Sequence, residues 1–153
     1  MKTAARWATT LLLTMSCISC LTHHQPRASP RVQVMDAVGT RTFVKDGRVV
    51  VDGPLGGGLY DLVKDNPAAA NDAIAHHIDL SLSVVIGAVS VVAGGTGIAL
   101  LASQEPDLAT PGIAAVAVGV LGAIPATILQ LTADTHMWRA INLYNDGLDA
   151  SAD

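Results

Sequence analysis

Aromatic residues are scarce in this chain: Phe, Tyr and Trp make up 3% of its 153 residues, although half of all residues are hydrophobic. The core of a soluble protein of this size usually takes much of its buried area from aromatic side chains. The apolar content here is Ala, Val, Leu and Ile, with 14 Gly. Small residues of this kind allow helices to pack closely within a membrane. The composition therefore favours membrane helices over a soluble core.

Positive charge is also sparse, with 9 Lys and Arg against 13 Asp and Glu and a net charge of −4. No basic cluster is present that could hold a nucleic-acid backbone, so nucleic acid is excluded as a partner. We also find no metal-ligand spacing, no cofactor motif and no nucleophile with an orienting base. We therefore expect no metal, no cofactor and no catalytic residue. The protein is predicted not to be an enzyme.

Cysteine occurs only twice, and both cysteines lie at the end of an N-terminal apolar segment. Lys2 and Arg6 precede an apolar run over residues 8–18 that is too short to span a bilayer as a helix. This pattern is typical of an export signal.

The two cysteines resemble the lipobox of bacterial lipoproteins, a short run of apolar and small residues that ends in Cys. In that family the chain is cut before the Cys, which then carries lipid such as palmitate. The resemblance implies a signal peptide over residues 1–19 and lipidation at Cys20. Cys17 is the alternative, because neither cysteine has the usual Leu three positions before it. A disulfide between the two, or two idle thiols, is the other interpretation.

The segment over residues 41–65 contains a strong hairpin signal. Asp46-Gly47 favours a type I′ turn between two short strands, which we place at 41–45 and 48–52. Residues 31–35 alternate and form a candidate third strand. Because a lone hairpin is marginally stable in water, we expect this segment to pack on a neighbouring element.

Two uncharged stretches, at about 80–102 and 112–133, are each long enough to cross about 30 Å of hydrocarbon as a helix. The Leu, Ile and Val residues of the first favour its insertion by roughly 3–7 kcal/mol. The rest of the chain offers too few residues to cover both helices in water. The sequence therefore predicts a transmembrane hairpin.

Both flanks of this hairpin carry recognisable boundaries. Asn66 is a favoured helix N-cap, and Pro67 fits the first helical position. After the second span, Trp138, Arg139 and Tyr144 suit an interfacial helix that anchors the chain at the membrane surface.

Small residues recur along one side of each predicted span, as they do where helices pack tightly in lipid. Alternatively, the same faces could join several hairpins into a pore lined by Ser90, Thr127 and Gln130. The predicted helix-packing residues are Gly87, Gly94, Gly97, Gly119 and Gly122.

From Asn66 onward the chain resembles a group of small uncharacterised bacterial envelope proteins and lipoproteins. These share an "NP-x-A" lead, a Gly-rich two-helix hairpin and a closing "A-(I/V)-x-x-YN" helix. This sequence lacks the Lys-rich flanks and the mid-hairpin Trp of that group. The resemblance implies an architecture and no activity. The matching residues are Asn66, Pro67, Ala69, Ala140, Ile141, Tyr144 and Asn145.

We therefore predict a mainly α fold, a two-helix transmembrane hairpin with a small N-terminal β-hairpin segment. The expected function is that of a non-catalytic, membrane-embedded envelope lipoprotein with a structural or assembly role. It would contact membrane lipid, a protein partner and further copies of itself; an oligomeric pore is the alternative. The predicted units are the signal peptide (1–19), a flexible tether (20–40), the exposed hairpin and short helix (41–65), the helical unit (66–148) and a tail (149–153).

Overall fold

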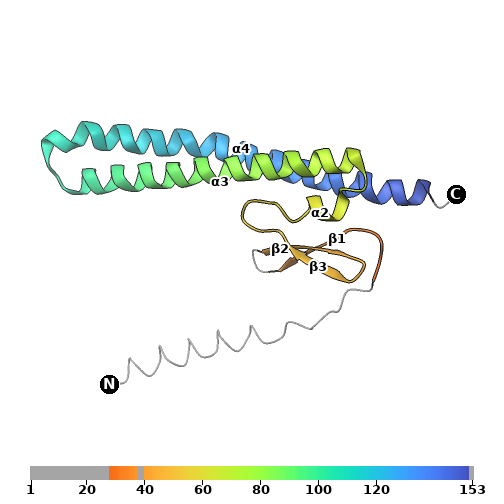
Figure 1. Ribbon diagram of the computed structural model, residues 1–153. Coiled ribbons are helices and arrows are strands. Elements are labelled where there is room, and N and C mark those ends of the chain that lie inside the picture. Colours follow the sequence, from red (N-terminus) through yellow and green to blue (C-terminus); the bar gives the residue numbers. More distant parts are fainter. Residues whose placement is uncertain (1–27, 38–39, 152–153) are drawn as a thin grey trace, which may run out of the picture.

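The computed structural model describes residues 28–37 and 40–151. The predicted signal peptide, with Cys17 and Cys20, lies outside the described residues. The described chain forms a small sheet, a short helix and two long helices that make a hairpin (Figure 1). This confirms the predicted fold class. The elements are β1 (Gln33–Ala37), β2 (Thr40–Lys45), β3 (Arg48–Val51), α2 (Tyr60–Val63), α3 (Pro67–Ala102) and α4 (Pro106–Ala150).

The sheet is antiparallel with strand order β1-β2-β3. Asp46 and Gly47 turn the chain between β2 and β3 with φ values of 52° and 77°, as a type I′ turn requires. β1 pairs with β2 from Gln33↔Val44 to Ala37↔Thr40. The expectation of a tether as far as residue 40 is therefore wrong, because the alternating residues at its end form the third strand.

Both long helices begin at a proline. The Asn66 side chain accepts hydrogen bonds from the backbone N–H groups of Ala68 and Ala69, at 3.1 and 3.2 Å, and so caps α3 as predicted. α4 begins at Pro106, six residues before the predicted start of the second span. Proline costs little at the first helical position because no intrahelical hydrogen bond is due there. The distal turn is thus only residues 103–105.

The second long helix is continuous as far as Ala150, so the predicted interfacial helix is not a separate element. It passes through Pro111 and Pro125 without ending. Each proline removes one backbone hydrogen bond. The remaining bonds of a 45-residue helix, and its long contact with α3, keep it intact.

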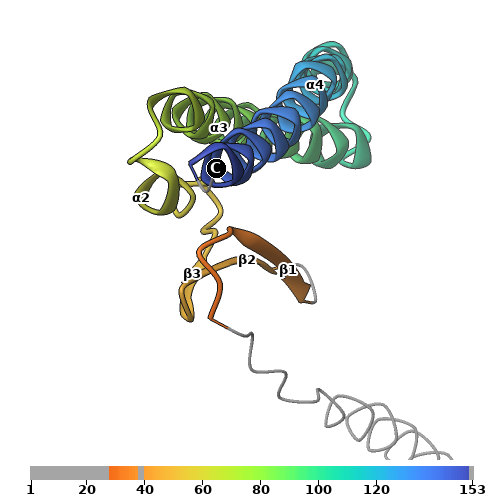
Figure 2. The same ribbon diagram turned by 90° about the vertical axis from the view of Figure 1, so that its right-hand side faces the viewer.

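The hydrophobic core lies at one end of the hairpin. There the sheet and α2 pack against the beginning of α3 and the end of α4 (Figures 1 and 2). We call this end the head. Its buried core residues are Val32, Phe43, Leu59, Leu62, Val63, Ala69, Ala73, Met137, Ala140, Ile141 and Tyr144.

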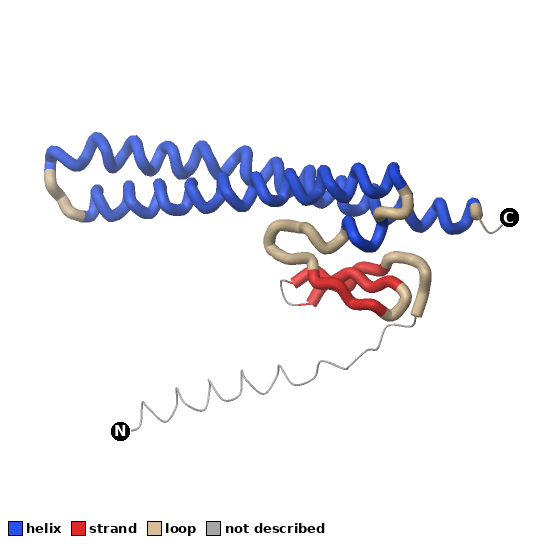
Figure 3. The backbone as a smooth tube through the Cα atoms, in the orientation of Figure 1, coloured by secondary structure: helices blue, strands red, loops and turns tan. Residues whose placement is uncertain are grey.

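Beyond the head, the two helices contact only each other within the described chain (Figure 3). Both are long and apolar enough to cross a membrane. In their most apolar 18-residue windows, only 11% of α3 and 17% of α4 is buried. Large side chains such as Val92, which is 68% exposed, point away from the partner helix. The spans are therefore not covered by other parts of the described chain.

Candidate functional site

Charged side chains gather where the head meets the two spans. They come from β1, β2, the loop after β3, α3 and α4, so residues far apart in sequence share one site. We call this group the junction network. Its members are Asp36, Arg41, Asp52, Asp72, His76, Asp79, Asp134, His136 and Arg139.

His76 forms the centre of the junction network and is fully buried. Its Nδ1 lies 2.9 Å from the carbonyl oxygen of Ala133, and its Nε2 lies 3.2 Å from Oδ2 of Asp52. Both partners are acceptors when Asp52 is ionised, so both hydrogen bonds form when each ring nitrogen of His76 carries a proton. Burial lowers the pKa of His76, but the hydrogen bonds to Asp52 and Ala133 and the Asp52 charge outweigh it. The pKa therefore lies above 6.5.

Asp52 is the partner of His76 and its side chain is only 3% exposed. One of its oxygens, Oδ1, is buried and receives no hydrogen bond from the described residues. A buried acceptor without a donor is costly, and such groups in folded proteins are few. Asp52 therefore has an unused capacity to accept a hydrogen bond.

Arg41 joins the sheet to α4. Its Nη1 donates to Oδ1 of Asp134 at 2.7 Å, and its Nε lies 3.4 Å from Oδ1 of Asp36. The same Nη1 is 3.1 Å from the sulfur of Met137. The planar guanidinium suits such forked contacts better than an ammonium group does. This arrangement fixes β2 beside the point where α4 leaves the head.

A second cluster ties α3 to α4 on their surface. His136 contacts Oδ1 of Asp72 at 3.0 Å and Oδ2 of Asp79 at 3.8 Å. Arg139 contacts the other oxygen of Asp72 at 3.2 Å. Asp72 and His76 lie one turn apart on α3 but do not pair with each other: Asp72 contacts His136 and Arg139 on α4, and His76 contacts Asp52 in the loop after β3.

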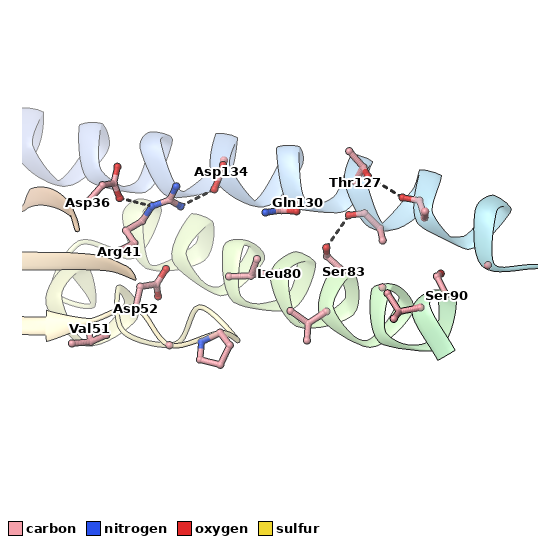
Figure 4. Close-up of a pocket in the computed structure, with 18 residues that line it drawn as sticks. Asp36, Arg41, Val51, Asp52, Leu80, Ser83, Ser90, Thr127, Gln130 and Asp134 are labelled. Atoms are coloured by element: carbon pink, nitrogen blue, oxygen red, sulfur yellow. Dashed lines mark hydrogen bonds and ion pairs between the residues drawn. The ribbon is translucent and has the colours of Figure 1, made fainter. Parts of the chain in front are cut away.

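A groove of about 890 Å³ begins at the junction network and continues between the two helices (Figure 4). Its polar end contains Arg41, Asp52 and Asp134, and Gln130 follows along α4. The remainder is lined mainly by small and aliphatic residues. These are Leu80, Ser83, Val84, Gly87, Ser90, Val91, Gly119, Ala123 and Ala126.

The predicted glycines lie at the contact between α3 and α4 but are not equivalent. A Cβ on Gly97 would lie 2.6 Å from the backbone nitrogen of Val116, and one on Gly119 would lie 2.7 Å from the Cα of Gly94. A Cβ on Gly122 would collide with the Ser90 side chain. The contacts for a Cβ on Gly87 or Gly94 are ordinary, at 3.9 and 3.8 Å.

The predicted interfacial anchors separate into two groups. Trp138 is 48% exposed, and the side chain of Arg139 is 68% exposed, so both can contact surroundings outside the head. Tyr144 is 8% exposed and belongs to the core, where Lys45 lies 4.4 Å from the ring centre. Tyr144 is therefore a packing residue, which corrects the expectation of an exposed anchor.

The two motifs that carried the family resemblance meet in the head. The amide of Asn66 donates to the carbonyl of Leu143 at 3.1 Å. The Asn145 amide makes two hydrogen bonds to the backbone of Val32, at 2.9 and 3.1 Å. Ala69 packs in the same core as the closing motif. Asn66 therefore joins the beginning of α3 to α4, and Asn145 joins α4 to the residue that precedes β1.

The hydroxyl groups near the histidines are engaged elsewhere. Ser81 donates to the carbonyl of Leu55, and Ser83 donates to the carbonyl of Ala126. No hydrogen bond joins a serine to a histidine in the described part of the chain. Among the same residues, no group of three or more His, Cys, Asp or Glu side chains could hold a metal ion.

Sequence reasoning missed Arg41, Asp52, Asp134 and His136. Asp134 had a usable signal, because a carboxylate immediately after an apolar span needs a partner near the membrane boundary. Its partner, Arg41, lies 93 positions earlier, and local patterns give no indication of that pairing.

No protein-family model, no curated protein and no solved structure matches this chain.

Proposed function

We propose that the protein is a non-catalytic membrane component of the bacterial cell envelope, with a structural or assembly role. In this proposal α3 and α4 cross the bilayer over residues 80–102 and 112–133. The head lies on the exported side, and Cys20, or Cys17, carries a lipid anchor. The family resemblance noted in the sequence supports the same placement.

One observation carries the proposal: the spans expose large aliphatic side chains that nothing else in the described chain covers. Val91, Val92 and Leu121 are each at least 66% exposed. Contiguous apolar surface of this extent is rare on soluble monomers. A bilayer removes it from water, and a helix satisfies its backbone hydrogen bonds internally, apart from those that its prolines remove.

The head supplies the surface for a protein partner. β3 is an outer strand of the sheet, and its side chains Val49 and Val51 are each 56% exposed. An outer strand offers free backbone groups to an incoming strand. A photo-crosslinker at position 49 is expected to capture an envelope protein or a second copy of the chain. The same probe at the exposed Asp61 is the control.

The pore alternative requires the small-residue faces to join separate hairpins. Gly97, Gly119 and Gly122 are instead used between the two helices of one hairpin. The hydroxyl of Ser90, an expected lumen residue, donates to the carbonyl of Ile86 in its own helix. These contacts favour the structural role over the pore.

Membrane placement is tested by cysteine labelling of single-cysteine additions to the otherwise unmodified chain, so that the proposed lipid anchor is kept. The chain without an added cysteine measures any labelling at Cys17 or Cys20. Val92→Cys should react with a membrane-impermeant maleimide only after detergent dissolves the bilayer. Arg48→Cys, in the head, should react in intact cells. Ser103→Cys, in the distal turn, should react once the inner face is opened. Equal labelling of Val92→Cys and Arg48→Cys in detergent-free extracts would contradict the proposal.

A further inference from the structure

We propose that the groove binds one phospholipid with a primary-amine headgroup, of the phosphatidylethanolamine type. Its ammonium group would meet Asp52 at the polar end, and an acyl chain would lie between the helices. The inference rests on the proposed function, since the bilayer is the source of this ligand.

The polarity of the groove matches that of a lipid. The charged end lies in the head, where α4 reaches Asp134, and the apolar part continues as far as Gly119. Fifteen residues separate these two positions, which is about 22 Å along a helix. Half of a typical hydrocarbon core is about 15 Å. The groove is therefore long enough for the chain of one leaflet together with its headgroup region.

Small residues give the groove its depth. Gly87 and Ala123 line it beside Gly119, while the aliphatic side chains of Val84 and Val91 form its rim. The hydroxyl of Ser83 is already bonded to the carbonyl of Ala126, so it does not make this part of the groove polar. The hydroxyls of Ser90 and Thr127 likewise donate to carbonyls of their own helices, so an apolar chain here leaves no hydroxyl unpaired. The Gln130 amide lies one helical turn from Asp134, towards the charged end.

The polar end is suited to a group with N–H donors. Asp36, Asp52 and Asp134 meet a single arginine there. Asp36 and Asp134 share Arg41, and one oxygen of Asp52 bonds to His76. The second oxygen of Asp52 has no donor among the described residues. Because Asp52 lines the polar end of the groove, a ligand ammonium placed there would supply the donor that this oxygen lacks.

Two other headgroup classes fit less well. A choline headgroup carries no N–H and leaves the free oxygen of Asp52 unpaired. An anionic headgroup without an amine would approach three carboxylates and one guanidinium. A primary-amine headgroup carries both an ammonium and a phosphate. Arg41 uses Nε and Nη1 in its ion pairs, so its Nη2 is left to donate to that phosphate.

The test is native mass spectrometry of the full-length protein, released from bilayer discs. The discs hold equal amounts of phosphatidylethanolamine, phosphatidylcholine and phosphatidylglycerol with identical chains. We expect one retained phosphatidylethanolamine, about tenfold over either competitor, as one charged hydrogen bond implies. Asp52→Asn should remove the preference for the amine, whereas Asp146→Asn, an equal charge change outside the groove, should leave it unchanged.

A second variant keeps the test decisive if Asp52→Asn does not fold. Ala123→Phe fills the apolar part of the groove and should abolish lipid retention of every class. Ala117→Phe, exposed on the same helix but outside the groove, is its control. Equal retention of ethanolamine and choline lipids by the unmodified chain would overturn the inference. So would an unchanged preference in Ala123→Phe.

Failure of this inference is distinguishable from failure of the proposed function. If Val92→Cys is protected by the bilayer but the released protein shows no preference among lipids, only the lipid site is wrong. If Val92→Cys is labelled without detergent, the spans are not in lipid, and both proposals fail together.

Discussion

Adding a single methyl group to either of two touching glycines should give opposite results. Gly94 on α3 and Gly119 on α4 face each other across the contact between the two helices. A Cβ on Gly119 would lie 2.7 Å from both the Cα and the nitrogen of Gly94. A Cβ on Gly94 would lie 3.8 Å from the Cα of Gly119, which is an ordinary contact. The asymmetry arises because the Cα–Cβ bonds of the two residues point in different directions.

The magnitude follows from this geometry. Backbone atoms cannot move aside separately, so Gly119→Ala must push the helices apart by about 0.5–1 Å, which forfeits a quarter to a half of each affected dispersion contact. Overpacking of this kind costs about 1–3 kcal/mol. Replacing Gly by Ala within a helix stabilises the helix by about 0.5–1 kcal/mol. Gly119→Ala should therefore destabilise the hairpin, and Gly94→Ala should leave it unchanged or stabilise it.

The assay is equilibrium unfolding of the purified protein in mixed micelles, followed by the loss of helical circular dichroism as SDS is added. Gly95→Ala is the matched control, because nothing lies within 4 Å of its added Cβ. The order of midpoints should be Gly94→Ala and Gly95→Ala at or above the unmodified chain, and Gly119→Ala below it. If Gly94→Ala were as costly as Gly119→Ala, the described packing of the helices would be wrong.

Three further predictions concern the head. The folded-state pKa of His76 is raised, so its ion pair with Asp52 stabilises the fold fully below about pH 6.5. This stabilisation is lost as the pH rises through the folded-state pKa. The thermal midpoint should therefore fall between pH 6 and pH 9, a dependence that His76→Gln weakens and the exposed His77→Gln does not. Asn66→Ala should cost about 1–2 kcal/mol in unfolding titrations because the α3 cap is lost, whereas Asn71→Ala, exposed on the same helix, should be neutral. Arg41→Lys should lower the unfolding midpoint despite keeping the charge, because an ammonium cannot reproduce the fork between Asp36 and Asp134; a midpoint equal to that of the unmodified chain would show that the fork is dispensable.

Much of the fold could be predicted because its signals are local. The Asp46-Gly47 turn, the Asn66 cap and the two uncharged stretches each depend on a few neighbouring residues. The errors arose where local signals were ambiguous. Pro106 is compatible with either a turn or a helix start, and the structure shows that α4 begins there.

Most of the junction network could not be predicted from the sequence, because its ion pairs form only when the sheet and the two long helices pack together. Asp52 lies 24 positions before His76, and His136 lies 64 positions after Asp72. Periodicity indicates which helix face is apolar, but not which strand will lie beside it. The small-residue rows were visible, yet which of two facing glycines tolerates a methyl group depends on the rotation of each helix.

The continuity of α4 has a mechanical consequence. One unbroken helix runs from the distal turn into the core of the head, and the ion pairs of Asp72 hold α3 beside it. The described chain has no hinge between these two parts, so the distance and the orientation of the head relative to the spans are fixed. Tilting the hairpin in the bilayer would swing the sheet through the same angle, and a partner pulling on the sheet would exert torque directly on the surrounding lipid.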